Sequence, residues 1–142
     1  MLKLTLSVLF VLLALQATAA KRYDRCSLAR ELSRLGVPRN DLSAWVCIAK
    51  FESEYNTQAV GPPNTDGSQD YGIFQINSLY WCAPPSGAFS HNMCGIRCQD
   101  LLVDSVQPSL GCSQKIKNAQ GWAAWTMWKK CDGQLPSIDD CF

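Results

Sequence analysis

The chain has little histidine: His91 is the only one among its 142 residues. A second imidazole is therefore missing, which argues against metal and catalytic sites that need a histidine pair. No serine lies in a nucleophile-elbow motif, and neither a P-loop nor a glycine-rich dinucleotide fingerprint is present. These absences argue against nucleotide-dependent enzymes and serine hydrolases of the elbow type.

The chain also lacks a strong net charge. Its 13 basic and 12 acidic residues give a formal charge of +1, and Lys3 is the only charged residue among the first 20. Residues 21–142 therefore carry 12 charges of each sign, a formal charge of zero. Long-range attraction to nucleic acid or an anionic membrane is weak for such a chain. We expect no nucleic-acid partner and no cationic, membrane-disrupting activity.

Only one long apolar run is present, and it stands at the N-terminus. Lys3 precedes an apolar stretch from Leu4 to Leu15, and small residues follow from Ala17 to Ala20. This order is typical of a secretory signal, and the stretch is short for a membrane span. We expect a signal peptide over residues 1–20, a secreted domain over residues 21–142, and no retained membrane anchor.

Cysteine, in contrast, is abundant. The predicted mature chain contains Cys26, Cys47, Cys82, Cys94, Cys98, Cys112, Cys131 and Cys141. An even count in a short exported chain indicates disulfides, here four, although spacing alone does not assign the pairs. Zinc is the alternative, because Cys94 and Cys98 have a possible ligand spacing and His91 is near. The oxidising context favours disulfides, so we predict no metal and no cofactor.

Helix signals occupy the first part of the domain. Asp24 can cap a helix that runs to about Leu35, where Gly36 provides a stop. Asp41 can cap a second helix that runs to about Glu54.

Turn signals follow. The Asp66-Gly67 dipeptide and the segment Tyr71–Ile76 predict a hairpin turn and a strand. Helical character returns near Asp100 and continues, with breaks, to Trp128, and Pro108 suits the first turn of a helix. We therefore predict an α+β domain with a cleft between a helical part and a small sheet.

Glu52 occupies an unusual place in the second predicted helix. On a helical wheel it falls between Trp45 and Ile48, within the apolar arc, whereas Lys50 and Glu54 fall on the opposite side. Burial would raise the pKa of this carboxyl, as a general acid requires. If the helix frayed before Glu52, the side chain would instead be solvated, and the wheel alone does not decide between the two.

Asp70 is the second acidic candidate. An aspartate near a hairpin usually serves the turn, but Asp66 is better placed for that role. In a polar stretch with Ser68 and Asn77, Asp70 is expected to stay ionised. A protonated glutamate opposite an ionised aspartate is the arrangement that cleaves glycosidic bonds.

Tryptophans recur at Trp122, Trp125 and Trp128. This spacing usually indicates a packed core, but aromatic faces also stack on sugar rings. The spacing alone does not decide between a role in the core and a role in sugar binding.

Two blocks carry a resemblance. They are Cys47-Ile-Ala-Lys-Phe-Glu-Ser-Glu-Tyr-Asn-Thr57 and Asn64-Thr-Asp-Gly-Ser-Gln-Asp-Tyr-Gly-Ile-Phe-Gln-Ile-Asn-Ser78. They resemble the signature blocks of chicken-type (c-type) lysozymes, and the likeness extends through all eight cysteines. The run Leu135-Pro-Ser-Ile-Asp-Asp-Cys-Phe142 is similar to the end of insect members.

The resemblance implies a monomeric, secreted muramidase of bacterial peptidoglycan, with a lysozyme-like fold, in defence or digestion. It implies Glu52 as general acid and Asp70 as nucleophile or cation stabiliser, in a retaining mechanism. Sugar-binding positions are implied at Asn64, Gln75, Asn77, Tyr80, Trp81, Ala124 and Trp125. The implied disulfides are Cys26–Cys141, Cys47–Cys131, Cys82–Cys98 and Cys94–Cys112.

The sequence departs from the family pattern in two places. Tyr80 replaces a common tryptophan, and the Gly61-Pro-Pro loop has an apparent one-residue insertion, so subsite preferences are open. α-Lactalbumin resembles this fold but lacks the acid pair and binds calcium through an aspartate-rich loop. The matching stretch, Cys98 to Cys112, contains only Asp100 and Asp104, so we expect no calcium there.

Overall fold

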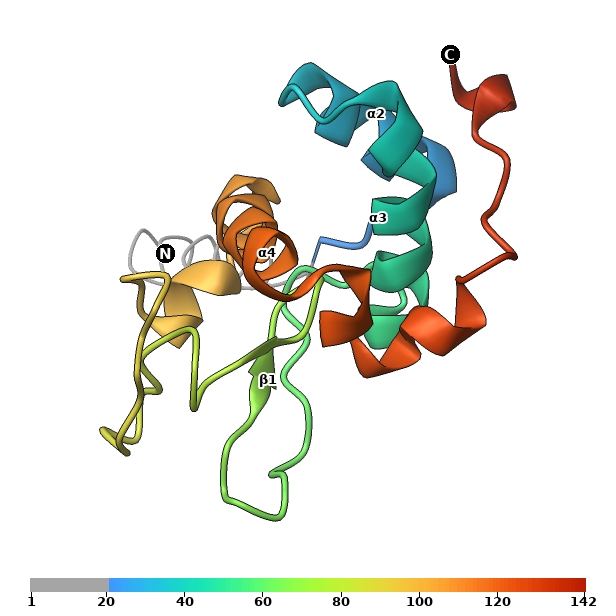
Figure 1. The fold of residues 1–142 in the computed structure, drawn as a ribbon. Coiled ribbons are helices and arrows are strands. Elements are labelled where there is room, and N and C mark those ends of the chain that lie inside the picture. The colour runs from blue at the N-terminus through green and yellow to red at the C-terminus, as the bar shows by residue number, and fades with distance from the viewer. Residues whose placement is uncertain (1–20) are drawn as a thin grey trace, which may run out of the picture.

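The computed structural model describes residues 21–142, so the predicted signal peptide lies outside the described residues. Helices α2 (Arg25–Arg34) and α3 (Arg39–Ser53) precede a two-stranded sheet, β1 (Asp70–Tyr71) and β2 (Ile76–Asn77), which helix α4 (Gln107–Gln120) follows. Figure 1 shows α2 and α3 in one part of the molecule, the loops around β1 in another, and α4 beside the place where the two parts meet. This is the predicted α+β arrangement.

The two N-terminal helices begin differently. The Asp24 side chain accepts a hydrogen bond from Ser27 N in a full capping box, as predicted. The prediction that Asp41 caps the second helix is wrong, because α3 already begins at Arg39, after Pro38. Asp41 lies within the first turn and forms an ion pair with Lys117 of α4, which ties the two helices together.

The hairpin region contains two turns where one was predicted. At the Asp66-Gly67 turn the chain reverses, so that Gly61 N donates to Asp70 O over 2.9 Å. The expected continuous strand over Tyr71–Ile76 is wrong, because residues 72–75 form a second turn between β1 and β2. Gly72 and Gln75 have φ values of 78° and 50°, which a regular strand does not contain. Within the sheet, Asp70 stands opposite Asn77.

The C-terminal third is only partly α-helical. Short 3₁₀ helices flank α4: η1 (Cys98–Leu101) before it, then η2 (Trp122–Ala124), η3 (Thr126–Lys130) and η4 (Asp139–Cys141) after it. Pro108 lies in the first turn of α4, as expected. The tryptophan-rich stretch is therefore a pair of short 3₁₀ helices and not one α-helix.

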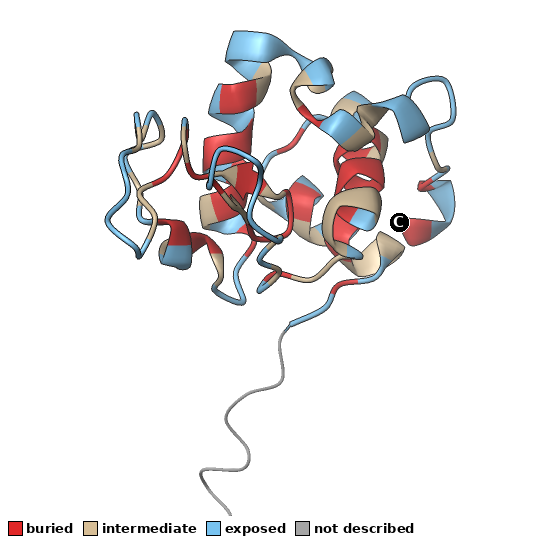
Figure 2. Ribbon diagram, turned by 90° about the horizontal axis from the view of Figure 1, so that it is seen from below, coloured by how far each residue is buried: buried red, intermediate tan, exposed pale blue. Residues whose placement is uncertain are grey.

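One hydrophobic core joins the two parts. Trp45 of α3 is 1% exposed and packs against Phe74 of the second turn at 5.2 Å between ring centroids. In Figure 2 the buried residues gather on the facing sides of the helices and in the turns between them. The buried turn residues explain why the hairpin is fixed against the end of α3.

Four disulfides fasten this arrangement. They are Cys26–Cys141, Cys47–Cys131, Cys82–Cys98 and Cys94–Cys112, the pairs that the resemblance implies. Cys94 and Cys98 belong to different bridges, so the zinc alternative is wrong.

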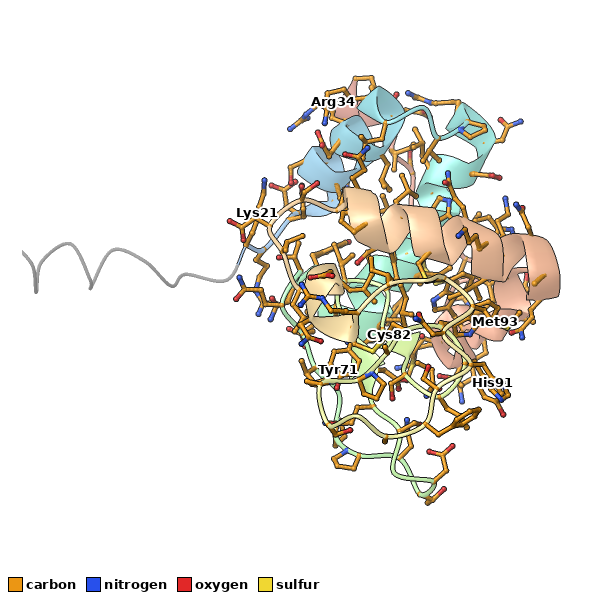
Figure 3. All side chains as sticks on the ribbon, turned by 90° about the vertical axis from the view of Figure 1, so that its left-hand side faces the viewer. Lys21, Arg34, Tyr71, Cys82, His91 and Met93 are labelled. Atoms are coloured by element: carbon orange, nitrogen blue, oxygen red, sulfur yellow. A yellow bond between two sulfur atoms is a disulfide. The ribbon has the colours of Figure 1, made fainter. Side chains whose placement is uncertain are left out.

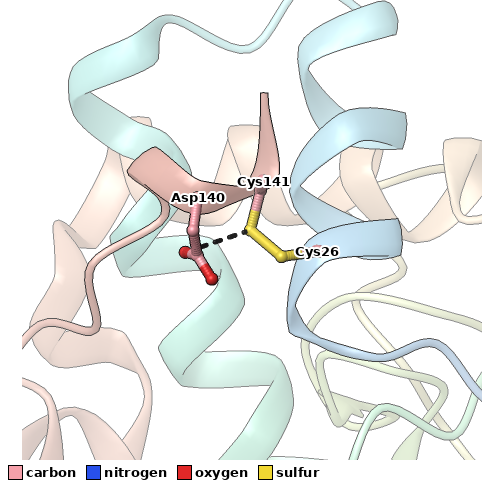
Figure 4. Close-up of side chains that lie close together, drawn as sticks. All are labelled: Cys26, Asp140 and Cys141. Carbon is pink, nitrogen blue, oxygen red and sulfur yellow. Dashed lines mark hydrogen bonds between the residues drawn. A yellow bond between two sulfur atoms is a disulfide. The ribbon is translucent and has the colours of Figure 1, made fainter.

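The first bridge joins the two ends of the described chain, as Figure 4 shows. Asp140 lies beside Cys141, with its Oδ1 atom 3.9 Å from the sulfur. A disulfide sulfur carries no hydrogen, so this is a packing contact. Arg25 donates to both oxygens of Asp140 at 2.6 Å each. Among residues 21–142 this is the one grouping with possible metal ligands, and its two sulfurs are bonded to each other.

Candidate active site

A cleft of about 370 Å³ lies between the helical part and the hairpin. Its walls come from the end of α3, the β1–β2 hairpin, α4 and the turn at 124–126. All nine sequence-predicted site residues line it: Glu52, Asn64, Asp70, Gln75, Asn77, Tyr80, Trp81, Ala124 and Trp125. The fold thus brings together residues that are up to 73 positions apart, from 52 to 125.

Glu52 lies in the last turn of α3. The helix continues to Ser53 and ends when Glu54 adopts a left-handed conformation with φ of 52°. The fraying alternative is therefore wrong, and the wheel's placement of Glu52 near the apolar face is right: Glu52 is partly buried. Burial raises the pKa of Glu52 from 4.5 to about 7, and the negative charge of Asp70 adds to the increase. A hydrogen bond from Met127 N to Oε1, at 3.3 Å, opposes the shift.

Trp125 forms an apolar part of the same cleft and is 5% exposed. Its indole Nε1–H donates to Phe74 O over 2.9 Å. Its ring meets Trp45 edge-on at 5.3 Å. Because a hydrogen bond and contacts with the rings of Trp45 and Trp122 hold the indole, Trp125 belongs to the packed core, and it also lines the cleft.

Asp70 belongs to a chain of polar groups on the opposite wall. Asn77 Nδ2 donates to Asp70 Oδ1 at 3.0 Å and to Ser68 Oγ at 2.9 Å. Ser68 Oγ also accepts from Asn64 Nδ2 at 3.1 Å and donates to Asp66 Oδ1 at 2.6 Å. The donors of Ser68 hold the pKa of Asp66 below its usual value. The hydroxyl has used its single hydrogen and both lone pairs, so the network fixes where Asn77 presents its amide to Asp70.

Two hydrogen bonds tie the wall that carries Asp70 to the wall that carries Glu52. Ser53 Oγ lies 2.7 Å from Ile73 O, and Trp125 Nε1 lies 2.9 Å from Phe74 O. Both acceptors belong to the turn between β1 and β2, so the hairpin cannot move relative to α3 and Trp125 without losing one or both bonds. The separation of the two carboxylates is thereby built into the fold.

Four cleft residues were not predicted: Ile76, Ile116, Gln120 and Thr126. Ile116 and Gln120 are four positions apart on α4 and therefore share one face of that helix. Their spacing in the sequence could have indicated that, if one of them lined the cleft, the other would as well. The Met127 amide was not accessible to sequence reasoning, because every residue has one.

A cleft with a carboxyl of raised pKa on one wall and a hydrogen-bonded aspartate on the other defines a site of the glycosidase type. The comparisons with known proteins agree. The profile of the C-type lysozyme/alpha-lactalbumin family matches residues 21–141, and this chain belongs to that family.

Its relatives include insect lysozymes. The chain is 60% identical to Lysozyme 2 of Lucilia sericata over 142 residues, all of both chains. It is 60% identical to Lysozyme B of Drosophila melanogaster, over 95% of this chain and 97% of the relative. Among solved structures, apo canine milk lysozyme superposes with a TM-score of 0.74 at 40% identity, covering 80% of this chain and 92% of that one. The predicted insect-like lysozyme fold is confirmed.

Proposed function

We propose that the protein is a secreted lysozyme that hydrolyses the β-1,4 bond between N-acetylmuramic acid and N-acetylglucosamine in bacterial peptidoglycan. The observation that carries this proposal is the pair of carboxyls, Glu52 and Asp70, in one cleft with unlike surroundings. Lysozyme is the type case for such a pair, and family membership and this geometry both support the roles proposed below.

Glu52 acts as the general acid. With a pKa of about 7 it holds its proton in mildly acidic and near-neutral solution, and it donates that proton to the leaving glycosidic oxygen. Asp70, on the opposite wall, attacks or stabilises the positively charged sugar carbon that results. Water then attacks the sugar carbon in place of Asp70 while Glu52, now ionised, takes a proton from that water, so the sugar is released with retained configuration.

The remaining cleft residues hold the substrate. Asn64, Gln75 and Asn77 supply amide groups, and Tyr80, Trp81 and Trp125 supply aromatic surface next to them. Tyr80 is 50% exposed, which leaves much of its ring free to contact a sugar. Ala124 adds a backbone position beside Trp125.

The test is turnover of bacterial cell walls. We expect Glu52→Gln to reduce kcat by about a hundredfold or more, because general acid catalysis contributes on the order of 10²–10⁴. Unchanged lysis by this variant would contradict the assignment. Asp70→Asn should also lower kcat strongly, and NMR of the first-formed product should show the β-anomer. Oligosaccharide binding without any turnover would favour a non-catalytic sugar-binding module instead.

Secretion is part of the proposal. Within the described residues no helix is both long and apolar enough to cross a bilayer, and four disulfides suit an oxidising compartment. N-terminal sequencing of protein recovered from culture medium should begin at about Lys21. Recovery of the uncleaved chain from membranes would contradict this point.

A further inference from the structure

Three aromatic rings continue outward from the edge of the cleft. Tyr80, which lines the cleft, lies parallel to His91, with 5.7 Å between ring centroids and 5° between planes. Phe89 meets His91 edge-on at 5.0 Å. Phe89 is 73% exposed, the most exposed large apolar residue of the described chain. Figure 3 shows His91 at the margin of the molecule, whereas Cys82 lies further in.

The loop that carries these rings is held firmly. His91 N donates to Leu79 O at 2.8 Å and Met93 N donates to Tyr80 O at 2.9 Å, so the backbones of the two ring-bearing segments are joined. Ser90 Oγ donates to Cys82 O at 2.8 Å. Disulfides at Cys82 and Cys94 fasten the base of the loop on both sides. An exposed phenylalanine on a loop held in this way is presented in a fixed position, so the loop would lose little conformational entropy when a ligand contacts it.

We propose that Phe89 and His91 form, beyond Tyr80, an outer platform for one further sugar of the glycan strand whose other units lie in the cleft. The inference rests on the proposed function for the identity of the glycan. A pyranose ring has an apolar C–H face and a polar rim, and it contacts a run of aromatic rings by that face. Because Tyr80 belongs to both the cleft and the run of rings, a strand that leaves the cleft past Tyr80 meets His91 and Phe89 next.

A protein partner fits this surface less well. Three aromatic side chains expose at most about 450–750 Å² when fully accessible, and Tyr80 is already half covered. A stable protein interface needs about 800 Å² from each partner. The area is therefore suited to one sugar unit and is small for a protein interface.

The test measures how affinity depends on oligosaccharide length. Calorimetry with β-1,4-linked N-acetylglucosamine oligomers of increasing length would be performed in a Glu52→Gln background, in which turnover is slowed, with and without Phe89→Ala. We expect the two proteins to bind short oligomers equally. Once the oligomer is long enough to pass Tyr80, we expect Phe89→Ala to bind roughly 3- to 10-fold more weakly. Phe89→Tyr, which keeps an aromatic ring, should bind each oligomer with the same affinity as the parent protein.

Leu135→Ala is the matched control, because Leu135 is also an exposed apolar residue, at 45%, and lies outside the cleft lining. It should not change affinity at any length. Equal affinities of Phe89→Ala and its parent at every length would overturn the inference, and so would an equal loss at every length, which would indicate a disturbed loop. Cell-wall lysis by the unmodified protein tests the proposed function separately. The platform can therefore fail while the lysozyme assignment stands, and the reverse.

Discussion

Replacing Glu52 by glutamine should make the protein more stable at alkaline pH while strongly lowering its activity. Burial raises the pKa of Glu52 to about 7, whereas in the unfolded chain the value is 4.5. Between these two values the folded state binds more protons than the unfolded state, so the free energy of unfolding falls as pH rises. Below pH 4.5 both states are protonated and the penalty is absent, and well above pH 7 it is complete. Glutamine has no proton to lose and avoids the penalty.

The size of the effect follows from the same values. A rise from 4.5 to about 7 corresponds to about 3.4 kcal/mol at 1.36 kcal/mol for each pH unit. Glu52 is only partly buried and keeps contact with solvent through the cleft. Solvent screening therefore reduces the difference, and we expect about 1–2 kcal/mol.

Urea unfolding at pH 4 and at pH 8 would measure it. The quantity of interest is the stability of Glu52→Gln minus that of the unmodified protein, which should increase by about 1–2 kcal/mol from the lower to the higher pH. Glu54→Gln is the matched control, since Glu54 lies two positions away and its side chain is 89% exposed. A Glu52→Gln difference that is the same at both pH values would refute the reasoning.

Three further predictions concern the cleft and its supports. The pH profile of kcat/KM should fall on its alkaline side with a midpoint near pH 7, where Glu52 loses its proton; a midpoint below pH 5.5 would contradict the raised pKa. Gly72→Ala should lower the free energy of unfolding by about 2–4 kcal/mol in thermal unfolding, because φ is 78° there and a Cβ would lie 2.8 Å from a backbone oxygen. Gly36→Ala is the control: φ is 89° but the surrounding space is open, so the cost should be about 1 kcal/mol. Equal costs at the two positions would contradict the steric argument. Ser113 Oγ is buried and lacks a hydrogen-bond partner among residues 21–142, so Ser113→Ala should be neutral or stabilising by up to about 1 kcal/mol. Ser109→Ala should instead destabilise the protein, because the Ser109 hydroxyl donates to Leu101 O. A loss of stability above about 1 kcal/mol for Ser113→Ala would contradict the prediction.

The helical half of the site was predictable because its signals are local. Asp24 supplies a cap that needs only its neighbour Ser27, and the wheel placed Glu52 beside Trp45 and Ile48 because one helix carries all three. The wheel alone could not show that the helix reaches Glu52. That depends on contacts from distant segments, such as the amide of Met127.

The hairpin half was less predictable because its geometry depends on tertiary contacts. Tyr71–Ile76 has the composition of a strand, yet the chain turns at Gly72, where the backbone approaches η1 closely. Ile73 and Phe74 are buried in that turn and accept hydrogen bonds from the helical side. No local pattern states which carbonyl meets which donor. The sugar-binding residues of the cleft were predicted from the family resemblance, because hydrophobic periodicity does not indicate which distant residues share a cleft.

The bridge between Cys26 and Cys141 makes the described chain nearly a closed ring. Their Cα atoms lie 4.8 Å apart although 115 positions separate them. Cleavage of one exposed loop between these two cysteines would therefore leave the fragments joined. The same closeness makes the protein suitable for circular permutation. A short linker could join the two ends, and new ends could open in an exposed loop far from the cleft.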